Sequence, residues 1–306
     1  MNATHFRLNK QRGFTLVEAI VVMVVTSILA GIMVLFIRKP VQNYVDAAGR
    51  ADMSDVADLA LRRMARELHG ALPNSIRITT VGTVTLLEFI PTKAGGTYLA
   101  EEDDAGTPYL DFVLPGATPP AGSNFYKFTV VGNMPAAPYN IVSGDYIVVY
   151  NLGPGFARAD AYSNAVNLMN RTQVNSVSGN VITMANNPFA VAAGSAPNSS
   201  PTHRFNIVNQ PVTFRCDPTA NGVGELKRYW NYNSVVNVFQ DTQIDPQTLG
   251  AKSSALLANY VTSCSFAYSN TINLQHGLLG LSLTLGRANS TESVTLTQQV
   301  NVENTP

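Results

Sequence analysis

The sequence predicts an α+β protein: a long N-terminal helical spine whose first half spans a membrane, packed on a predominantly antiparallel β-sheet head. Three observations predict it. The 24 residues from Phe14 to Ile37 include 19 apolar side chains. From Val41 to about Leu72, apolar residues recur three or four positions apart, as on one face of a helix. Residues 73–306 then read as short alternating or β-branched runs separated by turn residues.

The composition excludes several classes of protein. Of the 306 residues, 45% are hydrophobic and 13% are charged, with 20 basic and 20 acidic side chains. These values exclude a disordered polyelectrolyte, a collagen-like fibre and a strongly basic nucleic-acid binder. The equal numbers of basic and acidic side chains are not spread evenly along the chain, since residues 1–13 contain Arg7, Lys10 and Arg12 but no acid.

The apolar run is a candidate transmembrane helix. At about 1.5 Å per residue it is roughly 36 Å long, enough to cross the ~30 Å hydrocarbon layer of a bilayer. A cleavable secretory signal is the alternative, because it also has a basic start and an apolar run. The run is longer than a typical signal core, and Arg38-Lys39-Pro40 stands where a cleavage site would be expected. We therefore expect residues 14–39 to cross the membrane.

Residues 40–72 predict the amphipathic half of the same spine. Charged side chains lie between its apolar positions and would form a solvated face. Pro40 is expected to kink the helix or to remove one hydrogen bond. His69-Gly70 followed by Pro73 predicts the end of the helix. A continuous helix would run from Phe14 to Ala71.

Strand-like runs predict a β-rich head. A single antiparallel domain is favoured over several domains, although a long insertion at about 91–200 could form a subdomain. The four expected surface loops are Lys93 to Gly96, Pro115 to Asn124, Met134 to Pro138 and Ala192 to Pro201. The expected strands are Ser75 to Thr80, Thr83 to Ile90, Phe125 to Val131, Asp145 to Tyr150, Gln173 to Val177, Val181 to Met184, Arg204 to Val208, Val212 to Cys216, Glu225 to Trp230, Cys264 to Tyr268, Leu278 to Leu285 and Ser293 to Val302.

Glu18 is unusual in a membrane helix, because an unpaired carboxylate there costs on the order of a few kcal/mol. With its context, Gly13-Phe14-Thr15-Leu16-Val17-Glu18 after a basic leader, it resembles the signal of type IV prepilins and type II secretion pseudopilins. The resemblance implies that a membrane peptidase removes residues 1–13, cleaving between Gly13 and Phe14, and methylates the amine of Phe14. That amine is largely cationic at neutral pH. Glu18 could pair with it within one helix; the family implies pairing with a neighbouring subunit.

The C-terminal third resembles a narrower family, the minor pilins of the mannose-sensitive haemagglutinin (MSHA) pilus system. Within that system it is similar to the O-type biogenesis protein, and more distantly to the W-type minor pilins and the J-type pseudopilins of type II secretion. The resemblance rests on Arg215-Cys216-Asp217, Leu226 to Trp230, Ala255 to Ala258, Val261 to Phe266 and the final strand pair.

The two cysteines, Cys216 and Cys264, both lie in the exported part. An even number of cysteines in an envelope compartment favours an internal disulfide. Two cysteines alone cannot form a closed structural zinc site, which usually takes four ligands.

Enzymatic and metal-binding motifs are weak. The sequence contains no H-E-x-x-H motif, P-loop or G-x-S-x-G motif, and its four histidines are isolated. Tyr229, Trp230 and Tyr232 beside Lys227 and Arg228 suggest a sugar or nucleic-acid surface, but ordinary packing of one strand face is favoured. We expect no catalytic residue and no cofactor. The only candidate for a metal site is a calcium site in the acidic run Glu101, Glu102, Asp103 and Asp104. Such a run of charges more often forms a solvated loop.

The favoured function is that of a non-enzymatic minor pilin that helps to initiate, prime or cap a type IV, MSHA-like pilus. The alternatives are a J-type pseudopilin of type II secretion and a binding module at a pilus tip, with a membrane-anchored enzyme third. The expected partners are a prepilin peptidase, other minor pilins and the major pilin, an inner-membrane assembly platform and the lipid bilayer, with no nucleic acid. The expected location is the bacterial inner membrane, with one span and a periplasmic head, and then a pilus or pseudopilus.

Overall fold

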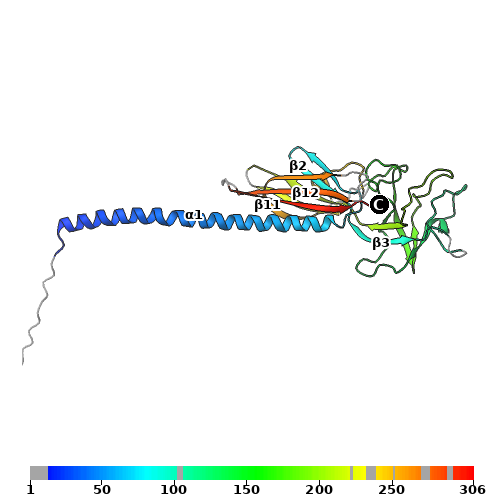
Figure 1. Ribbon diagram of the computed structural model, residues 1–306, viewed down its shortest axis with the longest axis horizontal. Coiled ribbons are helices and arrows are strands. Elements are labelled where there is room, and N and C mark those ends of the chain that lie inside the picture. The colour runs from blue at the N-terminus through cyan, green and yellow to red at the C-terminus, as the bar shows by residue number, and fades with distance from the viewer. Residues whose placement is uncertain are drawn as a thin grey trace, which may run out of the picture. The chain divides into compact units, whose positions relative to one another are not determined.

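The computed structural model describes residues 13–101, 106–220, 223–231, 239–250, 252–269, 276–287 and 292–306. The chain divides into two compact units, Met1–Asp52 and Met53–Pro306, and each is described separately. One α-helix and thirteen strands are found in the described residues (Figure 1). Their bounds are α1 Leu16–Leu68, β1 Arg77–Val81, β2 Val84–Phe89, β3 Thr92–Tyr98, β4 Lys127–Val131, β5 Tyr146–Val148, β6 Arg171–Ser178, β7 Val181–Met184, β8 Arg204–Val208, β9 Val212–Asp217, β10 Gly224–Trp230, β11 Ser253–Ser269, β12 His276–Gly286 and β13 Ser293–Glu303, with 3-10 turns at Asn124–Tyr126 and Pro246–Thr248.

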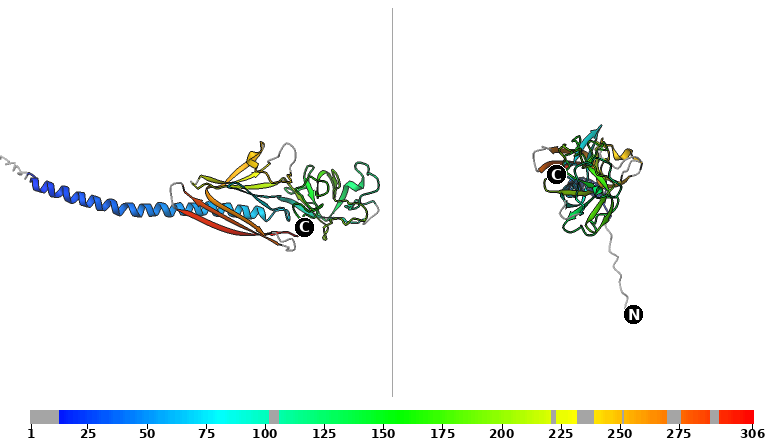
Figure 2. Two further views of the ribbon diagram at one scale, coloured as in Figure 1. Left: turned by 90° about the horizontal axis from the view of Figure 1, so that it is seen from above. Right: turned by 90° about the vertical axis from the view of Figure 1, so that its right-hand side faces the viewer.

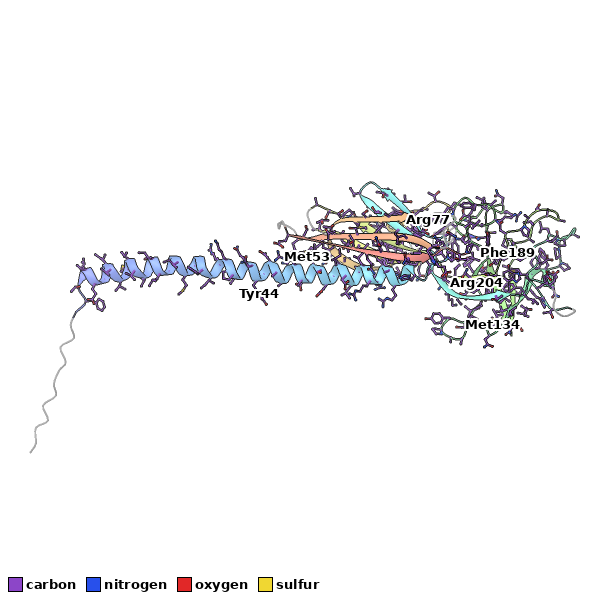
Figure 3. All side chains as sticks on the ribbon, in the orientation of Figure 1. Tyr44, Met53, Arg77, Met134, Phe189 and Arg204 are labelled. Atoms are coloured by element: carbon purple, nitrogen blue, oxygen red, sulfur yellow. A yellow bond between two sulfur atoms is a disulfide. The ribbon has the colours of Figure 1, made fainter. Side chains whose placement is uncertain are left out.

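The first unit contains the apolar part of helix α1. The helix continues through Pro40, which has no amide hydrogen to donate, so one backbone hydrogen bond is missing there. The side chains of this part stand out along the helix, as Figure 3 shows for Tyr44. The helix begins two residues after the expected Phe14 and ends at Leu68, close to the predicted stop.

The second unit begins with the amphipathic part of α1, which packs on the sheet. Met53, Ala57, Leu61, Met64 and Leu68 recur three or four positions apart, and all are buried. They share one hydrophobic core with inward-facing residues of β2 and β9 to β13. The predicted amphipathic face is thus the face that the head covers, and the α+β class is confirmed.

The sheet has seven strands in the order β1-β2-β9-β10-β11-β12-β13, and every pairing within it is antiparallel. It is folded into two leaves, with β1, β2, β9, β10 and the start of β11 in one and the end of β11, β12 and β13 in the other. Figure 2 shows these two leaves on opposite sides of the helix. The helical segment from Met53 to Leu68 is therefore held between two layers of one sheet.

The bend that separates the two leaves lies within β11. Tyr260 and Thr262 are each left unpaired by register shifts, and Tyr260 has a φ of 58°, in the left-handed region. Such bulges bend a strand and increase its twist. Gly224 of β10 lies opposite the bend, where a Cβ atom would stand 2.0 Å from the carbonyl oxygen of Val261. Only glycine fits at that position.

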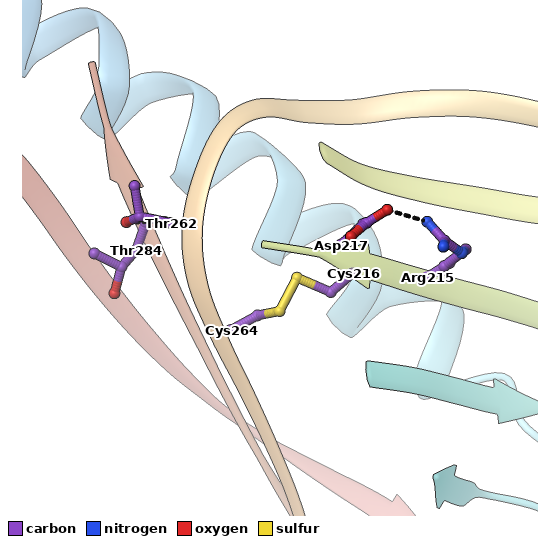
Figure 4. Close-up of a disulfide and its surroundings, with 6 residues drawn as sticks. All are labelled: Arg215, Cys216, Asp217, Thr262, Cys264 and Thr284. Carbon is purple, nitrogen blue, oxygen red and sulfur yellow. Dashed lines mark hydrogen bonds and ion pairs between the residues drawn. A yellow bond between two sulfur atoms is a disulfide. The ribbon is translucent and has the colours of Figure 1, made fainter. Parts of the chain in front are cut away.

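A disulfide between Cys216 of β9 and Cys264 of β11 joins the two leaves (Figure 4). β10 lies between these two strands in the sheet order, so the bond does not link adjacent strands. It connects one leaf to the other across the bend. Beside it, the Arg215 guanidinium pairs with Asp217 at 2.9 Å and with Asp245 at 3.0 Å. These contacts fix the end of β9 next to the bend.

The other strands form a closed barrel in the order β3-β4-β7-β6-β5-β8. Its core is aromatic and aliphatic, and the rings of Phe128 and Phe205 meet edge to face with their centroids 5.2 Å apart. The Tyr98 side chain is buried there, and burial raises the pKa of its hydroxyl to about 12.

Two sequence predictions for strands need correction. The expected loop from Lys93 to Gly96 is wrong, because these residues belong to β3 and close the barrel against β8. The glycines permit a close approach there: a Cβ atom on Gly96 would lie 2.8 Å from the Phe205 ring. The strand predicted from Cys264 to Tyr268 is the end of a much longer one, β11.

Buried asparagines connect the barrel to the sheet. The Asn74 side-chain amide donates to the carbonyl of Asn151 at 2.9 Å and to that of Asn304 at 3.1 Å. Asn151 in turn donates to the carbonyl of Pro73 at 2.7 Å. The Tyr162 hydroxyl donates to the carbonyl of Ser75 at 2.9 Å, and burial raises its pKa well above the ordinary value, so it remains a neutral donor. These hydrogen bonds fix the orientation of the barrel relative to the sheet.

The bend in β11 yields a test with a matched control. Gly224→Ala is expected to lower the free energy of unfolding by at least about 3 kcal/mol, because the new Cβ atom collides with backbone atoms that cannot move independently. Gly280→Ala, in β12 of the same sheet, places its Cβ atom 3.8 Å from the nearest atom and is expected to change stability by less than about 1 kcal/mol. Urea unfolding measures both; equal effects of the two substitutions would contradict the proposed close approach.

The disulfide yields a second test. Its cysteines are 48 residues apart, so replacing both with serine releases a loop whose closure is worth roughly 4 kcal/mol in the chain-entropy account. The expected result is a fall in Tm of about 10 °C, read by circular dichroism. Adding a reductant should lower the Tm of the unaltered chain and leave that of the double variant unchanged. An unchanged Tm in the double variant would show that the bond does not stabilise the folded sheet.

Candidate functional site

The expected processing site lies just before helix α1. Gly13, Phe14 and Thr15 have no regular secondary structure, and the helix begins at Leu16. A Cβ atom built on Gly13 would meet nothing within 4 Å, and the Phe14 side chain is 77% exposed. The peptide bond between Gly13 and Phe14 is therefore in accessible, non-helical backbone, which a peptidase can bind in an extended form.

Thr15 caps the first turn of the helix. Its hydroxyl oxygen accepts a hydrogen bond from the backbone N–H of Glu18 at 3.3 Å. This satisfies one of the N–H groups that have no partner inside a helix. This cap was not predicted, although Thr15-Leu16-Val17-Glu18 has the T-x-x-E pattern of a capping box, which is the sequence signal for it.

Glu18 lies in the first turn of α1, where the partial positive charge of the helix N-terminus favours a carboxylate. Its side chain is exposed, and it forms no ion pair with any residue that the structure describes. Phe14 and Glu18 are four residues apart, but Phe14 precedes the helix, so the two residues do not lie on one helical face here. The carboxylate is therefore accessible at the surface of the helix.

The helix that carries Glu18 has the properties of a membrane anchor. Within the described residues, the helix from Leu16 to His69 is long and apolar enough to cross a membrane, and no part of its most apolar window is buried within the molecule. The hydroxyl of Thr26 donates to the carbonyl of Val22 at 2.7 Å, and that of Ser27 to Met23 at 2.6 Å. The two hydroxyls are therefore satisfied inside the helix, as lipid requires.

The suggested calcium and sugar sites fall partly outside the described residues. Glu101 is exposed, whereas Glu102, Asp103 and Asp104 are not described. In the described part of the chain, no three histidine, cysteine, aspartate or glutamate side chains converge on a point where a metal ion could sit.

The aromatic pair in β10 shows the expected alternation. Tyr229 is buried in the head and Trp230 is half-buried on the other strand face, under the Arg228 guanidinium. Tyr232 lies outside the described residues.

The comparison with protein families matches the same N-terminal segment. The family model described as the prokaryotic N-terminal methylation motif matches residues 8–34, which include Gly13, Phe14 and Glu18. No curated protein and no solved structure matched the chain. The motif and the long apolar helix indicate a protein of the type IV pilin or pseudopilin type, processed as a prepilin and anchored in a membrane, with a pilin-like fold.

Proposed function

We propose that this chain is a non-enzymatic minor pilin, a subunit that helps to initiate, prime or cap assembly of an MSHA-like type IV pilus. The observation that carries the proposal is the accessible Gly13–Phe14 bond at the start of an exposed apolar helix whose first turn holds Glu18. The choice of the MSHA system rests on the resemblance of residues 215–266. A J-type pseudopilin of type II secretion would use the same N-terminal chemistry; deletion of this subunit would then abolish secretion instead of piliation.

In the proposed mechanism, the apolar helix exchanges one apolar environment for another. Its exposed side chains contact lipid before assembly and neighbouring helices in the filament afterwards. Cleavage after Gly13 creates a cationic amine on Phe14, and methylation by the prepilin peptidase retains its basic nitrogen. Glu18 of one subunit pairs with this amine on its neighbour, which offsets the cost of placing a carboxylate in the membrane, a cost on the order of a few kcal/mol that is lower near the interface than at the bilayer centre. The head then selects the partner subunits.

The proposal assigns one task to each segment. Residues 1–13 form the leader, 14–39 the membrane and filament-core helix, 40–72 the amphipathic half of the spine, and 73–306 the head. We propose further that the barrel of β3 to β8 is an insertion in a pilin head. It interrupts the chain between β2 and β9, which are paired neighbours in the sheet. The assembly platform, the other minor pilins and the major pilin are the proposed partners.

Processing is tested by co-expression with a prepilin peptidase followed by intact-mass measurement. The expected product begins at N-methylated Phe14. Gly13→Leu is expected to block cleavage without affecting the fold, because residue 13 contacts nothing. Gly31→Leu, a glycine with equally open surroundings inside the helix, should be cleaved normally. An unaltered chain that retains Met1 in the presence of active peptidase would contradict the proposal.

The role of Glu18 is tested by Glu18→Ala in cells that assemble the filament. The variant should be cleaved and reach the membrane, but its incorporation should fall at least about tenfold because the neighbour's amine loses its counter-charge. Thr26→Ala, which removes a polar group from the same apolar run, should be incorporated normally. Immunoblots of sheared filaments measure incorporation. Equal amounts of both variants in the filament would show that Glu18 has no part in assembly.

A further inference from the structure

A groove of about 330 Å³ opens where the barrel meets the sheet. It lies between the start of β5, the link from β8 to β9, and the end of β10. Its volume is at the lower end of the ~300–1,000 Å³ typical of small-molecule sites. The groove is lined by Pro91, Gly144, Asp145, Tyr146, Val208, Asn209, Gln210, Val212, Arg228, Trp230 and Asn231.

The charges of the groove are neutralised within the protein. Asp145 and Arg228 are the two charged residues in its lining. The Asp145 carboxylate pairs with Lys93 Nζ at 2.8 Å, and Arg228 Nε pairs with Glu67 Oε2 at 2.6 Å. The groove therefore offers no unpaired charge to an ionic ligand, and a ligand that brought its own charge would have to compete with these pairs.

Three side-chain amides supply the free hydrogen-bonding capacity of the groove. Asn209, Gln210 and Asn231 form no side-chain hydrogen bond with the residues that the structure describes. Each carries a donor and an acceptor. Asn231 directly follows β10 with a φ of 51°, a left-handed conformation that asparagine tolerates better than most residues. The three residues belong to two separate segments, and both segments line the groove.

Two aromatic side chains provide apolar surfaces beside the amides. The Arg228 guanidinium lies 4.8 Å from the centroid of the Trp230 ring and holds the indole in place. The Tyr146 ring packs edge to face against Phe239, with the centroids 5.0 Å apart. Both aromatic residues are half-buried, so part of each remains open to the groove.

We propose that this groove binds a neutral saccharide unit. A pyranose ring presents hydroxyl groups that both donate and accept, which suits the three amides, and C–H faces that suit the rings of Trp230 and Tyr146. The absence of an unpaired charge in the lining favours a neutral sugar over an acidic polysaccharide or a nucleic acid. The proposal adds a ligand to the head and does not depend on the assembly role of the N-terminal helix.

The single tryptophan of the chain makes the proposal directly measurable. Because Trp230 is the only tryptophan and lines the groove, its fluorescence reports on the groove and on the edge of the sheet core against which the ring also packs. The experiment titrates the full chain, in a detergent without a sugar headgroup, with the methyl glycosides of glucose, galactose and N-acetylglucosamine. Typical ligand efficiencies give an expected Kd on the order of 1 mM for a ligand of this size. Saturation-transfer NMR on the glycoside confirms binding independently of the fluorescence.

Variants connect the signal to the amides. Asn209→Ala and Gln210→Ala are each expected to raise Kd about tenfold through the loss of hydrogen bonds. Gln299→Ala, an exposed amide on β13 away from the groove, is the matched control and should leave Kd unchanged. Binding that is equal in all three variants would overturn the assignment of the site.

Charged probes test the ligand class. Heparin and single-stranded DNA should leave the Trp230 fluorescence unchanged at 150 mM salt, because surface charge effects are screened there over about 8 Å. A response to either probe but to none of the three glycosides would overturn the proposal of a neutral ligand. No response to any probe, with no saturation transfer to the glycosides, would overturn the proposal that the groove is a saccharide site.

Discussion

The packing of Met53 to Leu68 between the two leaves of one sheet is the contact on which the rest of the molecule depends. It buries the apolar face of the amphipathic part of α1, in a core that draws on six strands. The apolar part, from Leu16 to Asp52, has no such cover and forms a unit of its own. One helix thus supplies both the core of a head and an exposed apolar rod. This division is what a subunit needs if it is to be stable in water and still insert into lipid.

The folded sheet is itself possible because of two local features far apart in the sequence. Tyr260 adopts a left-handed conformation at the bend, and Gly224 leaves room for the backbone of Val261. The Cys216–Cys264 bond then joins the leaves on either side of the bend. Barrel and sheet are oriented by buried amides around Asn74, whose hydrogen bonds are directional and therefore fix an angle as well as a contact.

Sequence reasoning succeeded where the signal was local. The spine follows from a run of apolar residues and a helical period. The predicted cleavage site at Gly13 and Phe14 and the predicted assembly role of Glu18 rest on a linear motif, which the family model also matches. Most strands follow from alternation, and β7 and β8 have the predicted limits. β3 was missed because Gly95-Gly96 is typical of a loop. The reason for glycine at position 96 is a contact with a distant residue, since a side chain there would collide with the Phe205 ring. The left-handed Tyr260 and the three amides of the groove carry no local signal, since their roles arise from contacts between distant segments.

In the proposed mechanism, Glu18 pairs with the N-terminal amine of a neighbouring subunit and not with that of its own chain. Filaments assembled from a mixture of isotopically light and heavy subunits, treated with a zero-length carbodiimide, test it directly by mass spectrometry. The expected cross-links join the Glu18 peptide of one chain to the N-terminal peptide of another, either a different pilin or a copy with the other label. Cross-links found solely within one chain, light to light and heavy to heavy, would contradict it.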